Sequence, residues 1–330
     1  MRTTISEAVA EATKLEWIYP LSETQSFVFG PPLTVLIIAI RSLLIDKLAV
    51  KHGFSEWIFP RLIPEEVLAK TGWLTHHRSE AWNVSPKREF AYAQPDENGG
   101  GLFHRGDREP IDNRPYVLDP IQCVSFYYAF YSKSLKSLPI KAYEYQGGWT
   151  FRYETNADGI LRGKQFLRLE FVWLANEKEA QDIRNVLVFD AATAIDAYLQ
   201  VPVKVAEGDS CFEHPPQQVY APNRVWDLTT AKERAHDLPS IDLLFDSQHQ
   251  FPRSNEGFIE LASAGRHNQL PPRYKIKQAD STNPVWSGCC GLGLTRLVFA
   301  FLAVHGFSQD AWPNPFRDEY YRPRALGTSS

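Results

Sequence analysis

Residues 162–170 read Arg-Gly-Lys-Gln-Phe-Leu-Arg-Leu-Glu, and the predicted sheet is built around them. It leads into a strand predicted at residues 166–174, and an earlier strand is predicted at residues 140–149. The residues between the two, 154–162, are typical of a loop. We therefore predict an antiparallel hairpin with a long tip.

The segment before this hairpin predicts a helix followed by an edge strand. Gly-Pro-Pro at residues 30–32 opens an amphipathic pattern over residues 33–51, and Gly53 is positioned to end it. Residues 54–60 then predict a strand that ends at Pro60. Because proline has no N–H to donate, we expect this strand at a sheet edge or at an interface.

The other elements favour a mixed antiparallel sheet. Residues 94–114 are rich in Gly, Asp, Asn and Pro and predict a long surface loop. Strands joined by hairpins, without regular β-α-β alternation, indicate an α+β fold with an antiparallel sheet flanked by helices. The further predicted elements are helices at 117–136, 178–199 and 294–304, the last followed by Gly306, and strands at 201–205, 257–263 and 274–277.

The composition is that of a globular protein without the charge of a nucleic-acid binder. Hydrophobic residues make up 44% and aromatic residues 13% of the chain, which is enough for a substantial core. The formal net charge is -4, and Lys and Arg are spread along the sequence. The broad basic footprint of a dedicated nucleic-acid binder is therefore missing, and a small or acidic partner fits better.

The sequence also predicts a soluble, cytoplasmic protein with no membrane partner. The longest uncharged stretch, residues 24–40, is interrupted at residues 30–32 and is too short to span a bilayer. No secretory leader is recognised, and four cysteines are too sparse for a disulfide framework.

Three separated segments resemble the signature motifs of class II aminoacyl-tRNA synthetases, in the order that this family has. The predicted helix and strand up to Pro60 resemble motif 1, the dimer-forming segment, and so imply a homodimer. Residues 151–154, Phe-Arg-Tyr-Glu, together with residues 162–170 resemble motif 2, in particular the seryl-tRNA synthetase version with its Gln-Phe pair. Residues 291–296, Gly-Leu-Gly-Leu-Thr-Arg, resemble motif 3.

A possible zinc site makes the resemblance more specific. Cys123, Glu170 and Cys289 match the zinc-binding trio of the atypical seryl-tRNA synthetases and of their shortened relatives, the amino acid:[carrier protein] ligases. Three protein ligands leave one tetrahedral position open, which is typical of a substrate site. The resemblance implies that the amino group of an amino acid takes this position. Cys290 remains an alternative to Cys289 as the ligand.

The same resemblance implies which residues handle ATP. Arg152 and Arg296 are the expected catalytic residues, the first holding the α-phosphate and the substrate carboxylate, the second the γ-phosphate. A planar, permanently charged guanidinium suits both tasks, and Mg²⁺ prefers oxygen ligands. The further ATP-binding residues are expected to be Phe166 stacked on adenine, Glu154 at the adenine edge, and Glu260 with Ser263 carrying Mg²⁺.

Two more residues are candidates for the amino-acid pocket. Trp286 lies near the predicted zinc ligands in sequence, and its bulk favours a small substrate, Gly, Ala or Ser. His267 follows the predicted Mg²⁺ segment, although a single His more often has a structural role. Arg162 and Arg168 are left open between a substrate role and a solvated surface charge. The sequence does not identify the amino acid.

These expectations combine into an activating enzyme. Residues 31–315 are predicted to form the catalytic domain, between a lead segment at 1–30 and a tail at 316–330. The predicted reaction forms an aminoacyl-adenylate and passes the aminoacyl group to the phosphopantetheine thiol of an acidic acyl or peptidyl carrier protein. tRNA is expected to be an unlikely partner, because motif 1 begins near residue 33 with no room for a tRNA-binding module before it. Two alternatives remain: a seryl-type tRNA synthetase, and a non-catalytic synthetase paralogue that binds amino acid or a partner.

Overall fold

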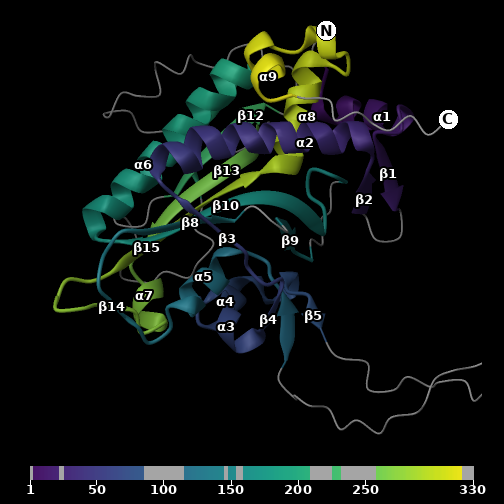
Figure 1. Ribbon diagram of the computed structural model, residues 1–330. Coiled ribbons are helices and arrows are strands. Elements are labelled where there is room, and N and C mark those ends of the chain that lie inside the picture. Colours follow the sequence, from purple (N-terminus) through teal and green to yellow (C-terminus); the bar gives the residue numbers. More distant parts are fainter. Residues whose placement is uncertain are drawn as a thin grey trace, which may run out of the picture.

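The computed structural model describes residues 3–21, 26–84, 115–144, 148–153, 159–208, 225–231 and 258–321. Its centre is a sheet with the strand order β11-β12-β13-β15-β10-β8-β3 (Figure 1). Neighbouring strands are antiparallel except β3 and β8, which are parallel, and β9 pairs with the start of β10. The α+β fold with an antiparallel-rich sheet is therefore confirmed. The strands are β3 (Ser55–Trp57), β8 (Ile140–Glu144), β9 (Trp149–Phe151), β10 (Gln165–Ala175), β11 (Lys204–Gly208), β12 (Val225–Ala231), β13 (Phe258–His267) and β15 (Trp286–Gly293).

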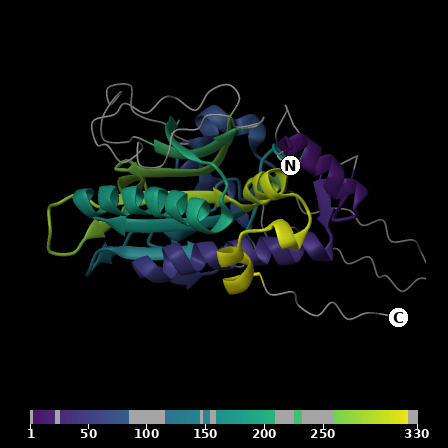
Figure 2. The ribbon, with the colours of Figure 1, turned by 90° about the horizontal axis from the view of Figure 1, so that it is seen from above.

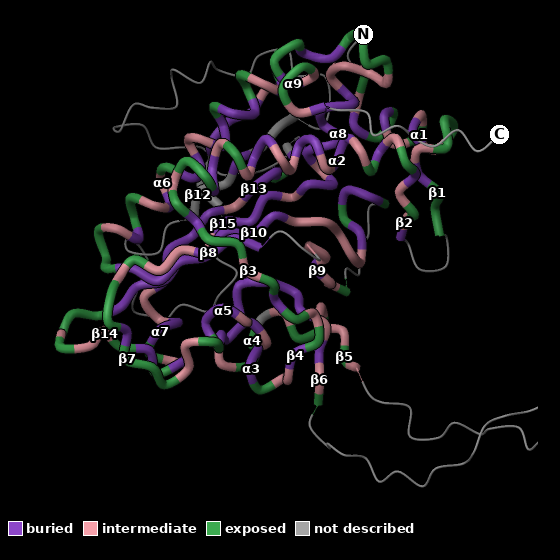
Figure 3. The backbone as a smooth tube through the Cα atoms, viewed as in Figure 1, coloured by how far each residue is buried: buried purple, intermediate pink, exposed green. Residues whose placement is uncertain are grey.

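Long helices bury one face of this sheet. Helices α6 (Glu177–Ala194) and α8 (Leu294–His305) pack on the central strands, and α2 (Pro31–Leu44) packs on both helices (Figure 2). The apolar residues of this side, including Phe171 and Trp173 from β10, form one continuous core. Figure 3 shows that β10 and β15 are buried along most of their length.

Short elements cover the opposite face, and a second core lies beneath them. This core includes Cys123 and, at its margin, Cys289, so the predicted zinc ligands lie on this side of the sheet. The elements are α3 (Glu65–Ala69), α4 (Trp73–His77), the 3-10 turn Arg78–Glu80, α5 (Cys123–Ala129), α7 (Leu270–Arg273), and the strands β4 (Leu62–Pro64), β5 (Asn83–Val84), β6 (Tyr116–Leu118), β7 (Ser134–Leu135) and β14 (Lys277–Gln278).

Several predicted elements agree with the structure. The helix predicted at 33–51 is α2 continued by a π-helical turn, Ile45–Val50, and Gly53 follows with φ 65°. The helix predicted at 178–199 is α6 with the π-helical turn Ile195–Leu199, and Gly306 ends α8 with φ 76°. Strand β3 is at the end of the strand order, as the proline at residue 60 predicts.

The helix predicted at 117–136 is wrong. The structure has β6, a turn, the short helix α5 and then β7 over these residues. Asp119 precedes Pro120, whose ring disfavours a helical backbone at the residue before it. The Asp119 carboxylate also accepts from the backbone N–H groups of Ile121 and Gln122 at 3.2 and 3.0 Å, which holds a turn where the helix was expected. The strand predicted at 274–277 is likewise reduced to β14, and strands β12 and β15 were not predicted.

The first thirty residues contain structure that the sequence did not indicate. Helix α1 (Ile5–Lys14) begins at a capping box between Thr4 and Glu7, and the hairpin β1 (Ile18–Leu21) and β2 (Ser26–Phe29) follows. Residues of α1 lie in the same core as α2 and α8. At the other end, the 3-10 turn Gln309–Ala311 leads to α9 (Asn314–Glu319), which also packs on that core. The domain boundaries at 30 and 315 stay a prediction.

Two further predictions concern the long loops and membrane-spanning helices. The long loop predicted at 94–114 lies outside the described residues, as does most of the hairpin tip. Among the described helices, none has the length and apolar character needed to cross a membrane.

Candidate active site

Three side chains from different elements form a cluster that could hold a metal ion. Cys123 begins α5, Glu170 lies in β10 and Cys289 lies in β15. Their ligand atoms all lie within 4.8 Å of one another, and Cys123 and Glu170 are buried. The fold thus brings together the trio named from the sequence.

Strand pairing distinguishes the two adjacent cysteines. Cys289 is paired with Val172, on the sheet face that carries Cys123. Cys290 is paired with Phe171 and is buried in the helix-covered core on the other face. Because successive residues of a strand point to opposite faces, Cys289 is the one that can join the cluster.

Burial disfavours negative charge at the cluster. It raises the pKa of Glu170 to about 7, because the loss of solvation outweighs the opposing effect of the Arg168 charge. The pKa of the Cys123 thiol is raised well above its ordinary value by burial and then by the Cys289 thiol. A divalent cation would lower both pKa values, since it stabilises the deprotonated donors. Two sulfurs and one carboxylate are a donor set that suits zinc.

Arg168 pairs with the carboxylate of the cluster. Its Nε lies 2.8 Å from Glu170 Oε2. Gly291 of β15 makes room for the guanidinium, because a Cβ at that position would lie 1.9 Å from the same nitrogen. Arg168 and Glu170 are two residues apart in a strand and so share a face. That spacing is the sequence signal that could have assigned Arg168 to the site.

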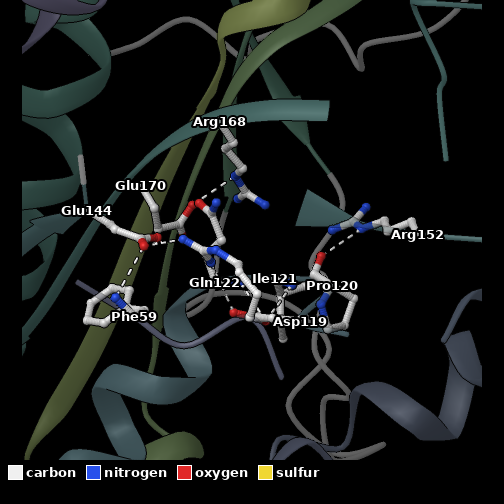
Figure 4. A network of polar contacts seen from close by, with 10 residues as sticks. Phe59, Asp119, Pro120, Ile121, Gln122, Glu144, Arg152, Arg168 and Glu170 are labelled. Carbon is white, nitrogen blue, oxygen red and sulfur yellow. Dashed lines mark hydrogen bonds and ion pairs between the residues drawn. The ribbon is translucent and has the colours of Figure 1, made fainter. Parts of the chain in front are cut away.

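A network of buried and partly buried charged side chains surrounds Glu170 (Figure 4). Glu144 in β8 lies directly opposite Glu170 and is ion-paired with Arg61. Arg61 Nη1 also lies 3.4 Å from Asp119 Oδ2. Burial raises the pKa values of Asp119 and Glu144, and Arg61 opposes both shifts. Sequence analysis missed Arg61 and Glu144, because they are far apart in the chain and belong to no motif.

Arg152 is held at the turn that leads into the cluster. Its Nε donates to Pro120 O at 3.0 Å, and its backbone N–H donates to Lys164 O at 3.0 Å. Its charge lowers the pKa of Glu170, although by less than that of Arg168. Arg152 is therefore fixed to the turn that precedes Cys123 and lies at the base of the hairpin that begins β10.

Arg296 connects the hairpin to β13 from the start of α8. Its Nε donates to Leu161 O at 2.8 Å, and its Nη1 donates to Glu260 O at 3.0 Å. Its neighbour Thr295 accepts from Leu167 N at 3.1 Å, next to half-buried Phe166. The fold therefore groups Arg296 and Phe166, two of the candidate ATP-binding residues, around the start of β10.

The candidate Mg²⁺ residues lie on β13. Glu260 is exposed, and Ser263 is paired with Gly291 of β15 on the face of the cluster. Glu154 lies outside the described residues. The assignment of all these residues to ATP and Mg²⁺ stays a prediction.

Of the two candidate pocket residues, only His267 faces the cluster. His267 Nε2 lies 3.9 Å from Cys289 Sγ. Trp286 lies in the core on the opposite face, where the Arg266 guanidinium stacks 4.8 Å from its ring centroid. Nearness in sequence was misleading for Trp286, because it is three residues from Cys289 and therefore points to the other side of the strand.

A comparison with protein families gives a match over residues 107–305. The matching family model is described as the tRNA synthetase class II core domain (G, H, P, S and T). The match covers motifs 2 and 3 and all three residues of the cluster.

The similar curated proteins are type-2 serine–tRNA ligases. That of Methanopyrus kandleri is 29% identical over 326 residues, which is 94% of this chain and 59% of that protein. That of Methanothermobacter thermautotrophicus is 28% identical, over 92% of this chain and 58% of the relative. The chain thus spans about three fifths of the length of these relatives.

Solved structures agree with this fold. A crystal structure of Aquifex aeolicus tRNASec in complex with the M. kandleri seryl-tRNA synthetase matches with a TM-score of 0.76 and 26% identity, over 99% of this chain and 63% of that one. A prolyl-tRNA synthetase from Cryptosporidium parvum, with L-proline and AMP, matches with a TM-score of 0.62 and 13% identity, over 91% of this chain and 52% of that one. This second likeness shows the fold alone.

One expectation about partners is wrong. We expected an acidic carrier protein as acceptor and tRNA as an unlikely partner. The similar proteins are serine–tRNA ligases, and one of them is solved with a tRNA bound. The expectation rested on overall charge and on the position of motif 1, and neither feature of a catalytic core determines which acceptor reaches it.

Proposed function

We propose, because this chain belongs to the class II aminoacyl-tRNA synthetase core family, that it activates serine with ATP and supplies the seryl group to a tRNA. The observation that carries the proposal is the cluster of Cys123, Glu170 and Cys289, with Arg152 bonded to the turn that leads into Cys123. The cluster offers a place for an amino group, and Arg152 offers a positive charge for the carboxylate. An α-amino acid carries both groups on one carbon.

Cys123, Glu170 and Cys289 would hold zinc, and the open fourth position would bind the neutral amine of the amino acid. Such a site selects a free α-amine, because thiolates and carboxylate leave only one position for a further ligand. Arg168, paired with Glu170 at 2.8 Å, keeps that carboxylate oriented toward the cluster. Zinc is thus proposed on the chemistry of the donor set.

The reaction needs no general base. The substrate carboxylate is ionised at neutral pH and attacks the α-phosphorus of ATP, so that a C–O–P linkage forms and the bond to pyrophosphate breaks. Arg152 would align the carboxylate and the α-phosphate and offset their negative charge. Arg296 would bind the γ-phosphate, Phe166 would stack on adenine with Glu154 at its edge, and Glu260 and Ser263 would carry Mg²⁺.

Serine and tRNA are proposed from the relatives, which are serine–tRNA ligases. A non-catalytic role is less well supported, because Arg152, Phe166, Glu260 and Arg296 are all present.

The first test is ATP–pyrophosphate exchange with each common amino acid, with zinc measured on the same sample. The expected result is serine-dependent exchange with about one zinc per chain, as one three-ligand site requires. Cys123→Ala should abolish zinc and exchange while ATP binding remains. Exchange that is unchanged in Cys123→Ala would refute the zinc assignment.

A second assay tests the acceptor. Radioactive serine should become attached to tRNA in an ATP-dependent reaction with the purified protein. Exchange without transfer to tRNA, but with transfer to a phosphopantetheine thiol, would refute the tRNA acceptor and leave activation intact.

A further inference from the structure

Gln122 combines complete burial with an amide for which the described residues offer no hydrogen bond. Its side chain has no exposed surface. Neither its Oε1 nor its Nε2 has a hydrogen-bond partner among the residues that the structure describes. An unpaired buried polar group destabilises the folded state, so such groups are rarely retained without a reason.

The backbone at Gln122 is strained as well. Its φ is 56° and its ψ is -42°, and Cys123 N–H donates across it to Ile121 O at 2.7 Å. This is a γ-turn with positive φ at a residue that carries a side chain, a rare and strained conformation. Strain of this kind persists only where the surroundings enforce it.

The surroundings do enforce it. Asp119 accepts from the N–H groups of Ile121 and Gln122, and its own N–H donates to Arg61 O at 2.8 Å. Phe151 N–H donates to Asp119 O at 3.1 Å. The turn is thereby fixed between the edge segment after β3 and the hairpin of β10, with Gln122 inside the network of Figure 4.

The position of the turn indicates what the amide is for. Gln122 directly precedes Cys123, a ligand of the proposed metal, and Arg152 donates to Pro120 in the same turn. In the proposed function, the metal site that includes Cys123 holds the substrate amine, and Arg152 holds the substrate carboxylate. The turn that carries the buried amide therefore adjoins both groups that would fix the α-carbon of the substrate.

We propose that Gln122 recognises the side-chain hydroxyl of the substrate, and this rests on the proposed function. A carboxamide has an acceptor oxygen and two N–H donors, and a hydroxyl is both donor and acceptor, so one hydroxyl can pair with both ends of the amide. A methyl group or a hydrogen in the same place leaves the buried amide unpaired. Gln122 is thus a specificity-determining residue that favours serine over alanine and glycine.

The size of the effect follows from the burial. A site built to hydrogen-bond a substrate hydroxyl rejects the analogue without it by about 10⁴–10⁵-fold, whereas an apolar pocket discriminates by only about 10². We expect the intact protein to show the larger ratio of kcat/KM for serine over alanine. Gln122→Met keeps the length and removes the amide, and its ratio should fall at least about 100-fold through loss of serine activity.

The test is pyrophosphate exchange with serine and with alanine for the full chain and three variants. Gln122→Asn shortens the side chain by one methylene, and asparagine tolerates positive φ better than most residues, so the turn should remain while discrimination falls. Thr150→Val is the matched control, because Thr150 is also fully buried and its hydroxyl has no hydrogen-bond partner in the described part of the chain, but it lies in β9. It should keep the serine-to-alanine ratio.

The outcomes separate the two proposals. Equal losses with serine and alanine in both Gln122 variants, with the ratio preserved, would mean a structural turn residue and would overturn the assignment. An intact protein that activates alanine as well as serine would overturn the assignment while activation stands. Absence of exchange with every amino acid would overturn the proposed function and the assignment together.

Discussion

Replacing Gly291 with alanine should separate Arg168 from Glu170. The new Cβ would lie 1.9 Å from Arg168 Nε and 2.1 Å from Nη2, where ordinary contacts begin near 3.4 Å. The guanidinium would have to move by about 1.5 Å, which is 3.4 minus 1.9. We expect a shift of this size to break the 2.8 Å contact between Arg168 Nε and Glu170 Oε2.

The loss can be converted into a rate effect. For the ion pair between Arg168 and the buried Glu170 carboxylate we take about 1.5–3 kcal/mol, the contribution typical of a polar contact to a charged group. At about 1.4 kcal/mol per factor of ten, kcat/KM for the amino acid should fall about 10- to 150-fold. Zinc content should fall as well, because burial already raises the pKa of Glu170 to about 7 and Arg168 is the main group that opposes it.

Gly293→Ala provides the matched control in the same strand. A Cβ there would have its nearest neighbour, Leu261 O, at 3.5 Å, an ordinary contact. Both variants would be assayed by serine-dependent exchange, zinc content and thermal unfolding. A Gly291→Ala protein whose kcat/KM lies within twofold of the Gly293→Ala protein would refute the role of Arg168 at Glu170.

Three further predictions use the two faces of the sheet and the buried carboxylate. Cys289→Ser should lose zinc and exchange, whereas Cys290→Ala should keep both, because Cys290 is buried on the other face; equal loss, measured by metal analysis, would contradict the assignment. Trp286→Phe should leave amino-acid preference in the exchange assay unchanged, since Trp286 stacks on Arg266 away from the cluster; an altered preference would return it to the pocket. Zinc uptake by metal-free protein should weaken as the pH falls below about 7, because Glu170 is then protonated. The contribution of Glu170 to the free energy of unfolding should have the opposite trend and fall as the pH rises from 4.5 to about 7, because the folded state binds more protons than the unfolded state in this range. Zinc titration and denaturant unfolding at several pH values measure both slopes, and slopes of the same sign would contradict this.

The long, strongly patterned elements could be predicted from the sequence. Helices α2, α6 and α8 have an apolar face or run that the core requires, and Gly53 and Gly306 end their segments with positive φ. Strand β15 was not predicted, although it carries Cys289. Its sequence, with three glycines among residues 286–293, lacks the β-branched and aromatic pattern of a strand, and it is held by pairing to β10 and β13.

The site could be predicted only where a motif carries it. Cys123, Glu170 and Cys289 were named because the resemblance assigns them, and Arg168 could have been added from its spacing to Glu170. Arg61 and Glu144 carry no local signal, since their role arises from pairing across strands that are distant in the chain. Trp286 was named from nearness in sequence, which fails in a strand because alternate residues point away from each other.

The wrong helix prediction and the geometry of the cluster have one physical origin. In a regular helix that began at residue 117, Cys123 would lie in the middle of the helix, and nothing in the sequence would direct its side chain toward β15. Instead Pro120 and the strained Gln122 delay the helix, so that it begins at Cys123 itself. One turn later, Tyr127 OH donates to Gly288 O at 2.9 Å and ties α5 to the residue before Cys289. Because residues four apart lie on one face of a helix, this bond also directs Cys123 toward β15, and the local break in the predicted helix is what brings the two cysteines together.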